Sequence, residues 1–592
     1  MGHKTANQNY FIKDYVIIFL QDKYFNTKGL KMSFKYSVGE NSKLVDETIK
    51  KLNDENVIER IWKKDHTVWS NDPTEISNRL GWLDSVDVTG KSVKEINQFV
   101  DEVRSAGFTH ALLMGMGGSS LAPEVFRLAF GVKDGYLDLA VLDSTHPDVV
   151  MDYTKKLNPA TTLYIVSTKS GGTVETFSFM KFFYNYVLHV LGKDEAGKHF
   201  VAITDPGSGL QKVAEELKFR KIFLNDPNIG GRFSALSLFG IVPAALVGVD
   251  VEKFLSLTKE EALNCKKSGK EISQNTAAVA GAIIGTLAKK GIDKLTYIIS
   301  PEFKFIGAWI EQLIAESTGK IGKGILPVDL ESIETPEYYS NDRLFVYIKL
   351  KDDSTYDSKI EKLKSAGFPI LELELEHKLE LGMQFFLWEF ATAVTGWVMQ
   401  IQPYDQPNVE QAKIVARKMM AEYQEKGKLP ELIPAFEEND IKVFGEIKTK
   451  SVGKILESFL SDCKSGQSYV AIQAYLNPTK ATTDALQKLR TSIQKKYKVA
   501  TTLGFGPRFL HSTGQLHKGD AGNGYFIQFT SGIEEDLPIP ENPGKKSTAI
   551  TFGILIKAQA LGDRQALVDN KRKVITIDLG NNVITSLNHL SI

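Results

Sequence analysis

Four short apolar runs between residues 110 and 204 each end in a cluster of small or polar residues, and helical stretches separate them. The runs are HALLMGMGGSS, LAVLDST, TTLYIVSTKSGGT and HFVAITDPGS. Strands that alternate with helices form a parallel sheet with helices on both faces. The pattern therefore predicts an α/β unit, and open sheets of this kind bind ligands at the carboxyl ends of their strands.

The same alternation starts again twice further along the chain. A second set of predicted strands is TYIIS at 296–300, GILPVDL at 324–330, RLFVYIKL at 343–350 and PILELEL at 369–375. A third set follows the charged stretch at 425–450 and consists of SYVAIQAYL, KVATTLGFG, YFIQFT and KVITIDL. We therefore expect two central α/β units and an additional C-terminal α/β unit.

The N-terminal part has a different pattern. Residues 41–105 carry apolar residues at three- and four-residue spacing, which predicts helices. Residues 1–31 are polar and aromatic without a clear period, so we expect them to stand outside a fold that begins at Met32. The expected division is 1–31 extension, 32–105 helical region, 106–255 first α/β domain, 256–435 second α/β domain and 436–592 C-terminal α/β unit, with the central junction near Gly240–Thr258.

Composition excludes several classes of protein. With 592 residues, 42% of them hydrophobic, the chain can bury several cores, so it is not a disordered protein. Its 72 basic and 72 acidic side chains balance, which argues against a dedicated nucleic-acid binder. Two cysteines, Cys265 and Cys463, cannot make a disulfide framework, and a reducing, cytoplasmic location is expected.

A membrane span is not expected. The longest apolar stretch, Leu381–Ile401, contains Glu389 and two glutamines, so a buried core helix fits it better. The short apolar run Val16–Leu20 is too short for the core of a secretory signal.

The first chemical motif is MGMGGSSLAPEVF, residues 114–126. A predicted strand ends in glycines that include Gly117 and Gly118, and Ser119 and Ser120 then open a helix. Glycines allow close approach of an anion, and a helix N-terminus presents free N–H groups to it. The motif has the form of a phosphate cradle, although a purely structural strand–helix turn has the same composition.

The second motif, STKSGGTVETFSF at residues 167–179, strengthens the phosphate interpretation. It places the hydroxyls of Thr168, Ser170 and Thr173 beside Lys169 at the end of a predicted strand, and Ser167 adds a fourth hydroxyl. Such a set of small donors suits a monoester phosphate better than an adenine nucleotide. A Ser or Thr helix cap would explain one of these hydroxyls but not four.

A cation and a carboxylate come from two further motifs. Arg232 follows two glycines in NIGGRFSALSLFG, at a turn that can aim a cation at developing negative charge. In WIEQLIAESTGK, Gln312 and Glu316 share one helix face. Glu316 stands near the helix C-terminus, where the dipole disfavours its ionisation and raises its pKa toward that of a general base. A surface salt bridge and a solvated helix-end Glu are the alternative interpretations.

The fifth motif is QPYDQPNVEQAKIVARK, residues 402–418. Pro407 suits the first turn of a helix, which places Gln406, Glu410 and Lys413 on one face. An exposed Glu–Lys face would have the same pattern.

These five motifs, in this order from about Gly115 to Lys413, resemble glucose-6-phosphate isomerase. The resemblance is closest to the isomerase half of bifunctional transaldolase/glucose-6-phosphate isomerase proteins, which have a segment similar to GFGPRFLHSTGQLHKGD at 504–520. It implies two doubly wound parallel-sheet sugar-isomerase (SIS-type) domains with a helical N-terminal arm. Since the chain has no room for a preceding transaldolase domain, we expect a free-standing isomerase.

The resemblance also implies roles for the motif residues in a reaction that needs no metal and no cofactor. Arg232 would stabilise an enediolate and Glu316 would move a proton between C1 and C2. Gln312, Gln406 and Lys413 would contact the sugar, with Lys413 also helping ring opening. The substrate phosphate would be held by Gly118, Ser119, Thr168, Lys169, Ser170 and Thr173. A homodimer is implied by the same analogy.

One residue of the family pattern is missing. The ring-opening histidine expected soon after the Glu316 motif has no counterpart in ESIETPEYYSND, residues 331–342. Candidates to replace it are Glu334, Glu337, Tyr338, His377, and the C-terminal His511 and His517. His511 and His517 do not have zinc-ligand spacing, and an ordinary loop or core histidine is the alternative for each.

Other functions stay open at this stage. An isomerase that also accepts mannose 6-phosphate differs in C2 stereochemistry, which these residues do not reveal. A non-catalytic sugar-phosphate-binding protein would keep the phosphate motifs, but Glu316, Arg232 and Lys413 argue against it. A transaldolase needs a Schiff-base lysine in a (β/α)₈ barrel, and the strand pattern is too short for one. The C-terminal unit could cover the active site, form a subunit interface or hold its own ligand.

Overall fold

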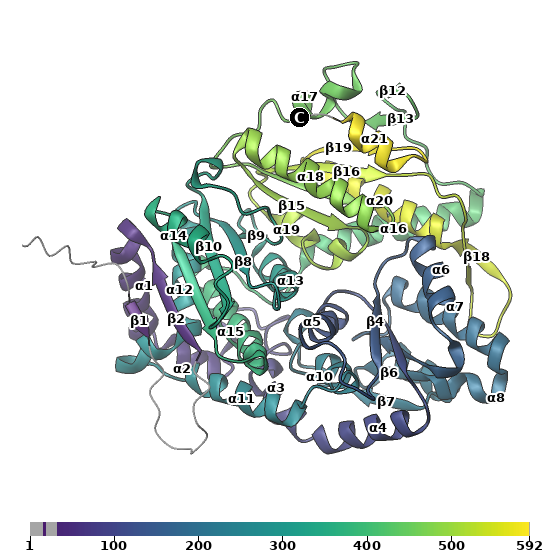
Figure 1. Cartoon of the computed structure of the whole chain (residues 1–592), viewed down its shortest axis with the longest axis horizontal. Helices are drawn as coiled ribbons and strands as arrows, with labels where there is room; N and C mark the ends of the chain where they lie inside the picture. The colour runs from purple at the N-terminus through teal and green to yellow at the C-terminus, as the bar shows by residue number, and fades with distance from the viewer. Residues whose placement is uncertain (1–15, 19–31, 591) are drawn as a thin grey trace, which may run out of the picture.

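The computed structural model describes residues 16–18, 32–590 and 592. Three α/β units, each with its own sheet, lie against one another (Figure 1). The first unit occupies the lower right of the view, the second the left and the third the top. The mixed α/β fold with parallel sheets confirms the predicted fold class.

The first sheet is entirely parallel, with the strand order β4-β3-β5-β6-β7. Its first strand, β3, lies between β4 and β5, so the direction of winding reverses between the neighbouring strands β3 and β5. This reversal is the place where doubly wound sheets bind ligands. The strands are β3 His110–Gly115, β4 Asp138–Leu142, β5 Thr162–Ser167, β6 Phe200–Thr204 and β7 Lys221–Leu224. The helices are α5 Leu121–Phe130, α6 Pro147–Lys156, α7 Val174–Leu191, α8 Lys193–Ala196, α9 Gly209–Glu216 and α10 Leu238–Leu246.

The N-terminal region is helical over 42–105, as the periodicity predicts, but it begins with strands. Its helices are α1 Ser42–Asp54, α2 Val57–Trp62, α3 Ser85–Gly90 and α4 Val93–Ser105. In front of them, β2 Ser33–Ser37 pairs antiparallel with a strand of the second sheet, and β1 Val16–Ile18 pairs with β2. The expectation that residues 1–31 stand outside the fold is therefore wrong for Val16–Ile18. The rest of that segment lies outside the described residues.

The second sheet has the order β1-β2-β11-β10-β8-β9, and its four later strands are parallel. These are β8 Lys294–Ile299, β9 Leu326–Val328, β10 Arg343–Leu350 and β11 Ile370–Leu375. The helices are α11 Val251–Asn264, α12 Thr276–Lys289, α13 Ile306–Thr318, α14 Asp357–Ser365, α15 Leu381–Met399 and α16 Pro407–Lys426. Helix α15 is buried along almost its whole length, which confirms the predicted core helix. Among the described residues, none of the helices has the length and apolar character that crossing a bilayer requires.

The third unit contains a sheet with the order β12-β13-β19-β16-β14-β15. Four of its strands are parallel: β14 Tyr469–Ala474, β15 Ala500–Phe505, β16 Gly524–Thr530 and β19 Lys573–Asp578. Strands β12 Phe436–Glu438 and β13 Ile441–Phe444 extend it in antiparallel pairing. The helices are α17 Ile455–Phe459, α18 Lys480–Tyr497, α19 Gly514–Gly519, α20 Phe552–Asp569 and α21 Val583–His589.

The third unit packs closely on the other two. A hairpin of β17 Pro538–Pro540 and β18 Thr548–Thr551 reaches over α7 of the first unit, and α16 of the second lies beside α20 (Figure 1). Phe552, at the start of α20, stacks on Phe179 of α7 and meets Phe182 of the same helix edge-on. The first and third units therefore share an apolar core.

Candidate functional site

A cavity of about 620 Å³ opens where the three units meet. The first unit contributes the loops after β3 and β5, the second contributes α13 and α16, and the third contributes the segment after β15 together with α20. Fourteen of the residues singled out in the sequence line this cavity: Gly117, Gly118, Ser119, Thr168, Lys169, Ser170, Thr173, Arg232, Gln312, Glu316, Gln406, Glu410, Lys413 and His511.

The glycine turn after β3 lies between two other segments of the site. Gly117 has a left-handed backbone with φ of +54°, and a methyl group there would overlap the backbone of His511. A methyl group on Gly118 would overlap the carbonyl oxygen of Gly231. Glycine is therefore required here because the turn touches both the Arg232 turn and the His511 segment.

The hydroxyl-rich loop after β5 leads into the N-terminus of α7. The hydroxyls of Thr168 and Thr173 lie 3.1 Å apart, and α7 begins at Val174. Lys169 forms an ion pair with Asp205 and donates to the carbonyl of Pro227 at 2.7 Å. Hydroxyls and free helix N–H groups at the reversal point of a parallel sheet form an anion site.

Arg232 and Glu316 form a buried ion pair in the centre of the cavity. Arg232 Nη1 lies 3.3 Å from Glu316 Oε2, although 84 residues separate the two in sequence. Burial raises the pKa of the Glu316 carboxyl, and the nearby charges of Arg232 and Lys413 oppose that rise. The sequence argument predicted a raised pKa from the helix dipole; the structure agrees with the direction, but burial is its main cause.

The guanidinium of Arg232 is held from several sides. Its Nε donates to Ser317 Oγ at 2.9 Å, its Nη1 to Gln406 Oε1 at 2.8 Å, and its Nη2 to the carbonyls of Pro403 at 2.7 Å and Asp405 at 3.0 Å. A cation fixed in this way can stabilise negative charge without rearranging.

Helices α13 and α16 present their predicted faces to the cavity. Gln312 Nε2 lies 3.4 Å from Glu316 Oε2 and donates to the carbonyl of His511 at 2.8 Å. Pro407 occupies the first turn of α16, as expected. Lys413, further along the same helix, lines the cavity. Lys413 is half-buried there, whereas Glu410 on the same helix is exposed and pairs with Arg417.

The third unit brings one histidine into the cavity. His511 Nε2 lies 3.0 Å from Glu175 Oε1, in the first turn of α7. The same Glu175 oxygen accepts a hydrogen bond from Gln559 Nε2 at 2.7 Å, and Thr145 Oγ1 donates to Gln559 Oε1 at 2.8 Å. Burial would raise the pKa of Glu175, but the charge and hydrogen bond of His511 lower it below the usual value.

The other candidates for the missing histidine lie elsewhere. His517 is buried in the third unit beside Gln473, and burial holds its pKa well below the usual value. Glu337 is exposed on a 3₁₀ turn, and Glu334 pairs with Lys495 at 3.0 Å. His377 accepts a hydrogen bond from the backbone N–H of Leu379. None of these residues, nor Tyr338, lines the cavity, so the placement of His517 and Glu337 in the site is corrected.

Sequence reasoning missed five polar residues that line the cavity: Arg79, Glu175, Asp205, Arg417 and Gln559. Glu175 stands two residues after Thr173 in the second motif, and Asp205 directly follows a predicted strand, so both had a local signal. Gln559 lies within a helix of the C-terminal unit and has no such signal.

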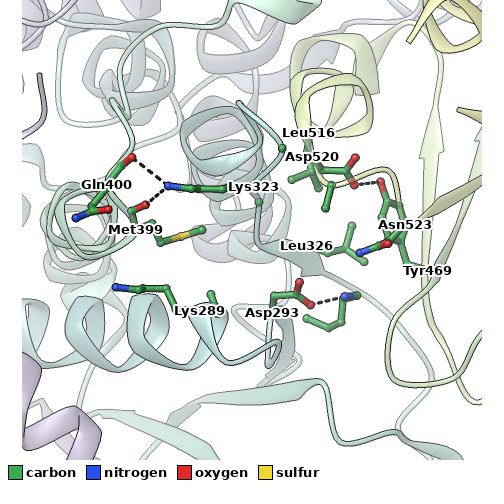
Figure 2. Close-up of a pocket in the computed structure, with 15 residues that line it drawn as sticks. Lys289, Asp293, Lys323, Leu326, Met399, Gln400, Tyr469, Leu516, Asp520 and Asn523 are labelled. Carbon is green, nitrogen blue, oxygen red and sulfur yellow. Dashed lines mark hydrogen bonds and ion pairs between the residues drawn. The ribbon is translucent and has the colours of Figure 1, made fainter. Parts of the chain in front are cut away.

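A second cavity, of about 340 Å³, lies between the second and third units (Figure 2). Two of its polar side chains are engaged with other groups of the protein: Asp520 accepts from Tyr469 at 2.8 Å, and Lys323 donates to the carbonyl of Met399 at 2.8 Å. It contains none of the candidate catalytic or substrate-binding residues.

The fold and the first cavity define a class: the chain is a mixed α/β protein whose cavity combines a hydroxyl-rich anion-type loop with a buried cation–carboxylate pair. In its fold it is similar to a glucose-6-phosphate isomerase from Chlamydia trachomatis, with a TM-score of 0.58 and 17% identity over 67% of this chain and 89% of the other. It is also similar to a hypothetical protein from Thermus thermophilus, with a TM-score of 0.57 and 22% identity over 66% of this chain and all of the other. At these identities the likeness establishes the fold alone.

Residues 74–330 match the model of the phosphoglucose isomerase family. The chain is 26% identical to glucose-6-phosphate isomerase from Thermus thermophilus over 59% of this chain and 91% of the relative. It is 28% identical to the Mycoplasmopsis pulmonis enzyme of the same name over 56% of this chain and 87% of that relative. These matches confirm the resemblance to glucose-6-phosphate isomerase; the likeness to the bifunctional subtype stays a prediction.

Proposed function

We propose that this chain interconverts D-glucose 6-phosphate and D-fructose 6-phosphate through a cis-enediol. The observation that carries the proposal is the Arg232–Glu316 pair, which lies in the same cavity as the phosphate-type loop of residues 167–173. An aldose–ketose isomerisation needs one base at C1 and C2, one cation beside the developing oxyanion, and a site that holds the phosphate at a distance.

The phosphate end of the substrate would lie at the N-terminus of α7. Thr168, Ser170 and Thr173 supply hydroxyl donors there, and Ser119 supplies another from the neighbouring turn. Lys169 would contribute a positive charge that Asp205 partly offsets. Charge-assisted and helix-terminal hydrogen bonds together favour a dianionic monoester at this position.

The proton transfer would use Glu316. In its ionised form it takes the proton from C2 of glucose 6-phosphate and returns it to C1, while the fixed guanidinium of Arg232 stabilises the enediolate oxygen. Because burial raises the pKa of Glu316, its carboxylate is a stronger base than an exposed one.

Ring opening would fall to His511, which takes the role that no residue of the 331–342 segment can fill. Its Nε2 lies 3.0 Å from Glu175 Oε1, so the carboxylate orients the imidazole. Lys413, on the neighbouring helix face, would assist at the ring oxygen. The third unit therefore contributes directly to the chemistry in this proposal.

The test is turnover of fructose 6-phosphate by the purified chain, with and without EDTA, beside Glu316→Gln. We expect metal-independent activity that falls about 10²- to 10⁴-fold in the variant, with substrate binding largely retained. Glu311→Gln is the matched control: it lies on the same helix outside the cavity, and burial raises its pKa to about 8, so the residue is already largely neutral near pH 7.

Three results would change the proposal. Near-normal turnover in Glu316→Gln would refute the assignment of the base. Tight binding of fructose 6-phosphate without exchange of its C1 proton into solvent would favour a binding protein, and product formed from mannose 6-phosphate alone would favour a dual isomerase. We also propose a cytoplasmic homodimer, for which native mass spectrometry tests the oligomeric state.

A further inference from the structure

Arg508 of the third unit binds two carboxylates of the first unit. Its Nη1 lies 3.1 Å from Asp143 Oδ2, at the end of β4, and its Nη2 pairs with Glu124 on α5. The side chain of Arg508 is 26% exposed, that of Glu124 29% and that of Asp143 10%, so the contact with Asp143 is the better shielded from water. One guanidinium shared by two carboxylates is a strong and directional contact.

The same short segment carries the histidine of the active site. Arg508 and His511 are the first and last residues of one 3₁₀ turn, Arg508–His511, directly after β15. The carbonyl of His511 accepts from Gln312, and its backbone packs against Gly117. The turn is therefore held at one end by Arg508 and at the other by groups of the active site.

The carboxylates that Arg508 binds are themselves part of the phosphate-site scaffold. Asp143 Oδ2 accepts from Ser120 Oγ at 3.3 Å, and Ser120 immediately precedes α5 and follows the glycine turn. Glu124 lies in the first turn of that helix. Arg508 thus joins the histidine segment to the helix that begins at the glycine turn.

We propose that Arg508 is a positioning residue for ring opening: its contacts with Asp143 and Glu124 dock the third unit so that His511 reaches the substrate. The inference rests on the proposed role of His511. Without Arg508, two carboxylates would lose their cation, and the turn would be free to move away from the first unit. A displacement of His511 by about 1 Å would cost about 10²-fold in rate.

Ring opening can be measured separately from isomerisation. In a Glu316→Gln background the proton transfer is blocked, and exchange between the α and β anomers of glucose 6-phosphate, followed by NMR, reports ring opening alone. Adding His511→Asn should lower this exchange about 10²-fold or more. Adding Arg508→Gln should lower it about 10²-fold, whereas the bound fraction of glucose 6-phosphate should change little.

The matched control removes a different contact between the same two units. Asn477 Nδ2 donates to Asp148 Oδ2 at 2.9 Å, just after the end of β14 and away from the histidine turn. Asn477→Ala should leave anomer exchange unchanged. An equal fall in this control would mean that docking in general matters and would overturn the specific role of Arg508.

Two further variants test the role of Arg508 in case the chain with Arg508→Gln does not fold. Arg508→Lys keeps the positive charge but loses the two-carboxylate geometry, and Asp143→Asn with Glu124→Gln removes the negative charges while keeping the arginine. Each should lower anomer exchange at temperatures where circular dichroism shows a folded chain. Normal exchange in folded Arg508→Lys and in the double variant would refute the inference.

The two proposals fail differently. If His511→Asn leaves anomer exchange unchanged, the proposed role of His511 is wrong, and the inference falls with it. If His511→Asn abolishes exchange but the Arg508 variants do not, only the inference is wrong.

Discussion

His511 and Glu175 stand 336 residues apart in sequence, yet the imidazole Nε2 lies 3.0 Å from the carboxylate Oε1. His511 comes from the third unit, and Glu175 comes from α7, the helix that follows the phosphate-type loop. Their pairing links the C-terminal unit to the phosphate end of the cavity, so we expect both residues to matter for the same step.

Glu175→Gln keeps the shape of the side chain but removes its charge. The imidazole of His511 would lose the carboxylate that orients it, so we expect ring opening to slow by about 10- to 100-fold while proton transfer at C1 and C2 is less affected. Anomer exchange and isomerisation, measured in parallel on glucose 6-phosphate, check this. Glu410→Gln is the control, because Glu410 lines the same cavity but pairs with Arg417; an equal loss in both variants would contradict the prediction.

The acid limb of the pH profile should report Glu316. The base must be ionised, and burial raises its pKa, so activity falls as the pH decreases through that raised value. The charge of Lys413 opposes this rise in the pKa of Glu316. Lys413→Gln removes that charge, so it should raise the pKa of Glu316 further and move the acid limb of kcat/KM to higher pH. Lys418→Gln, on the same helix but outside the cavity, should leave the limb in place. A shift to lower pH in Lys413→Gln would refute the assignment.

Gly118→Ala should abolish activity. The added methyl group would overlap the carbonyl oxygen of Gly231, so either the glycine turn or the turn that carries Arg232 must move. We expect a loss of at least about 10²-fold in kcat/KM, since small displacements of catalytic groups have effects of that size. Gly90→Ala in α3, where the new methyl group meets no atom within 4 Å, is the control. Wild-type kinetics in Gly118→Ala would show that the turn is not needed in this form.

Because of Glu389, the stability of the fold should fall as the pH rises. Its side chain is 0% exposed in the middle of α15, neither carboxylate oxygen has a hydrogen-bond partner among the described residues, and burial raises its pKa well above the usual value. The folded chain therefore keeps a proton that the unfolded chain releases above about pH 4.3. Between about pH 4.3 and the pKa of Glu389 in the folded chain, the titration of this residue lowers the free energy of unfolding by about 1.4 kcal/mol for each pH unit.

Glu389→Gln removes this titration, so the variant should gain stability relative to the parent as the pH rises above about 4.3. Urea unfolding at several pH values measures the difference. A stability difference that does not change with pH would contradict the buried neutral carboxyl. Glu425→Gln near the end of α16, where the side chain is exposed, should show no such trend.

Local sequence determined the strands, the loops that follow them and much of the site's chemistry. The apolar runs of β3 and β5 end in residues that suit an anion, because glycines allow its close approach and hydroxyls at the strand ends can donate to it. The helix faces of Gln312 with Glu316, and of Gln406 with Lys413, also followed from helical periodicity alone. These inferences hold because each depends on residues within a few positions of one another.

Only the tertiary structure decided which distant residues meet. No local pattern distinguishes His511 from His517, yet one faces the cavity and the other is buried in the third unit. The raised pKa of Glu316 likewise comes mainly from burial, which depends on how three units close around one helix. Contacts such as Arg508 with Asp143 join parts of the chain hundreds of residues apart; the docking of whole units creates them, and local propensity does not encode such docking.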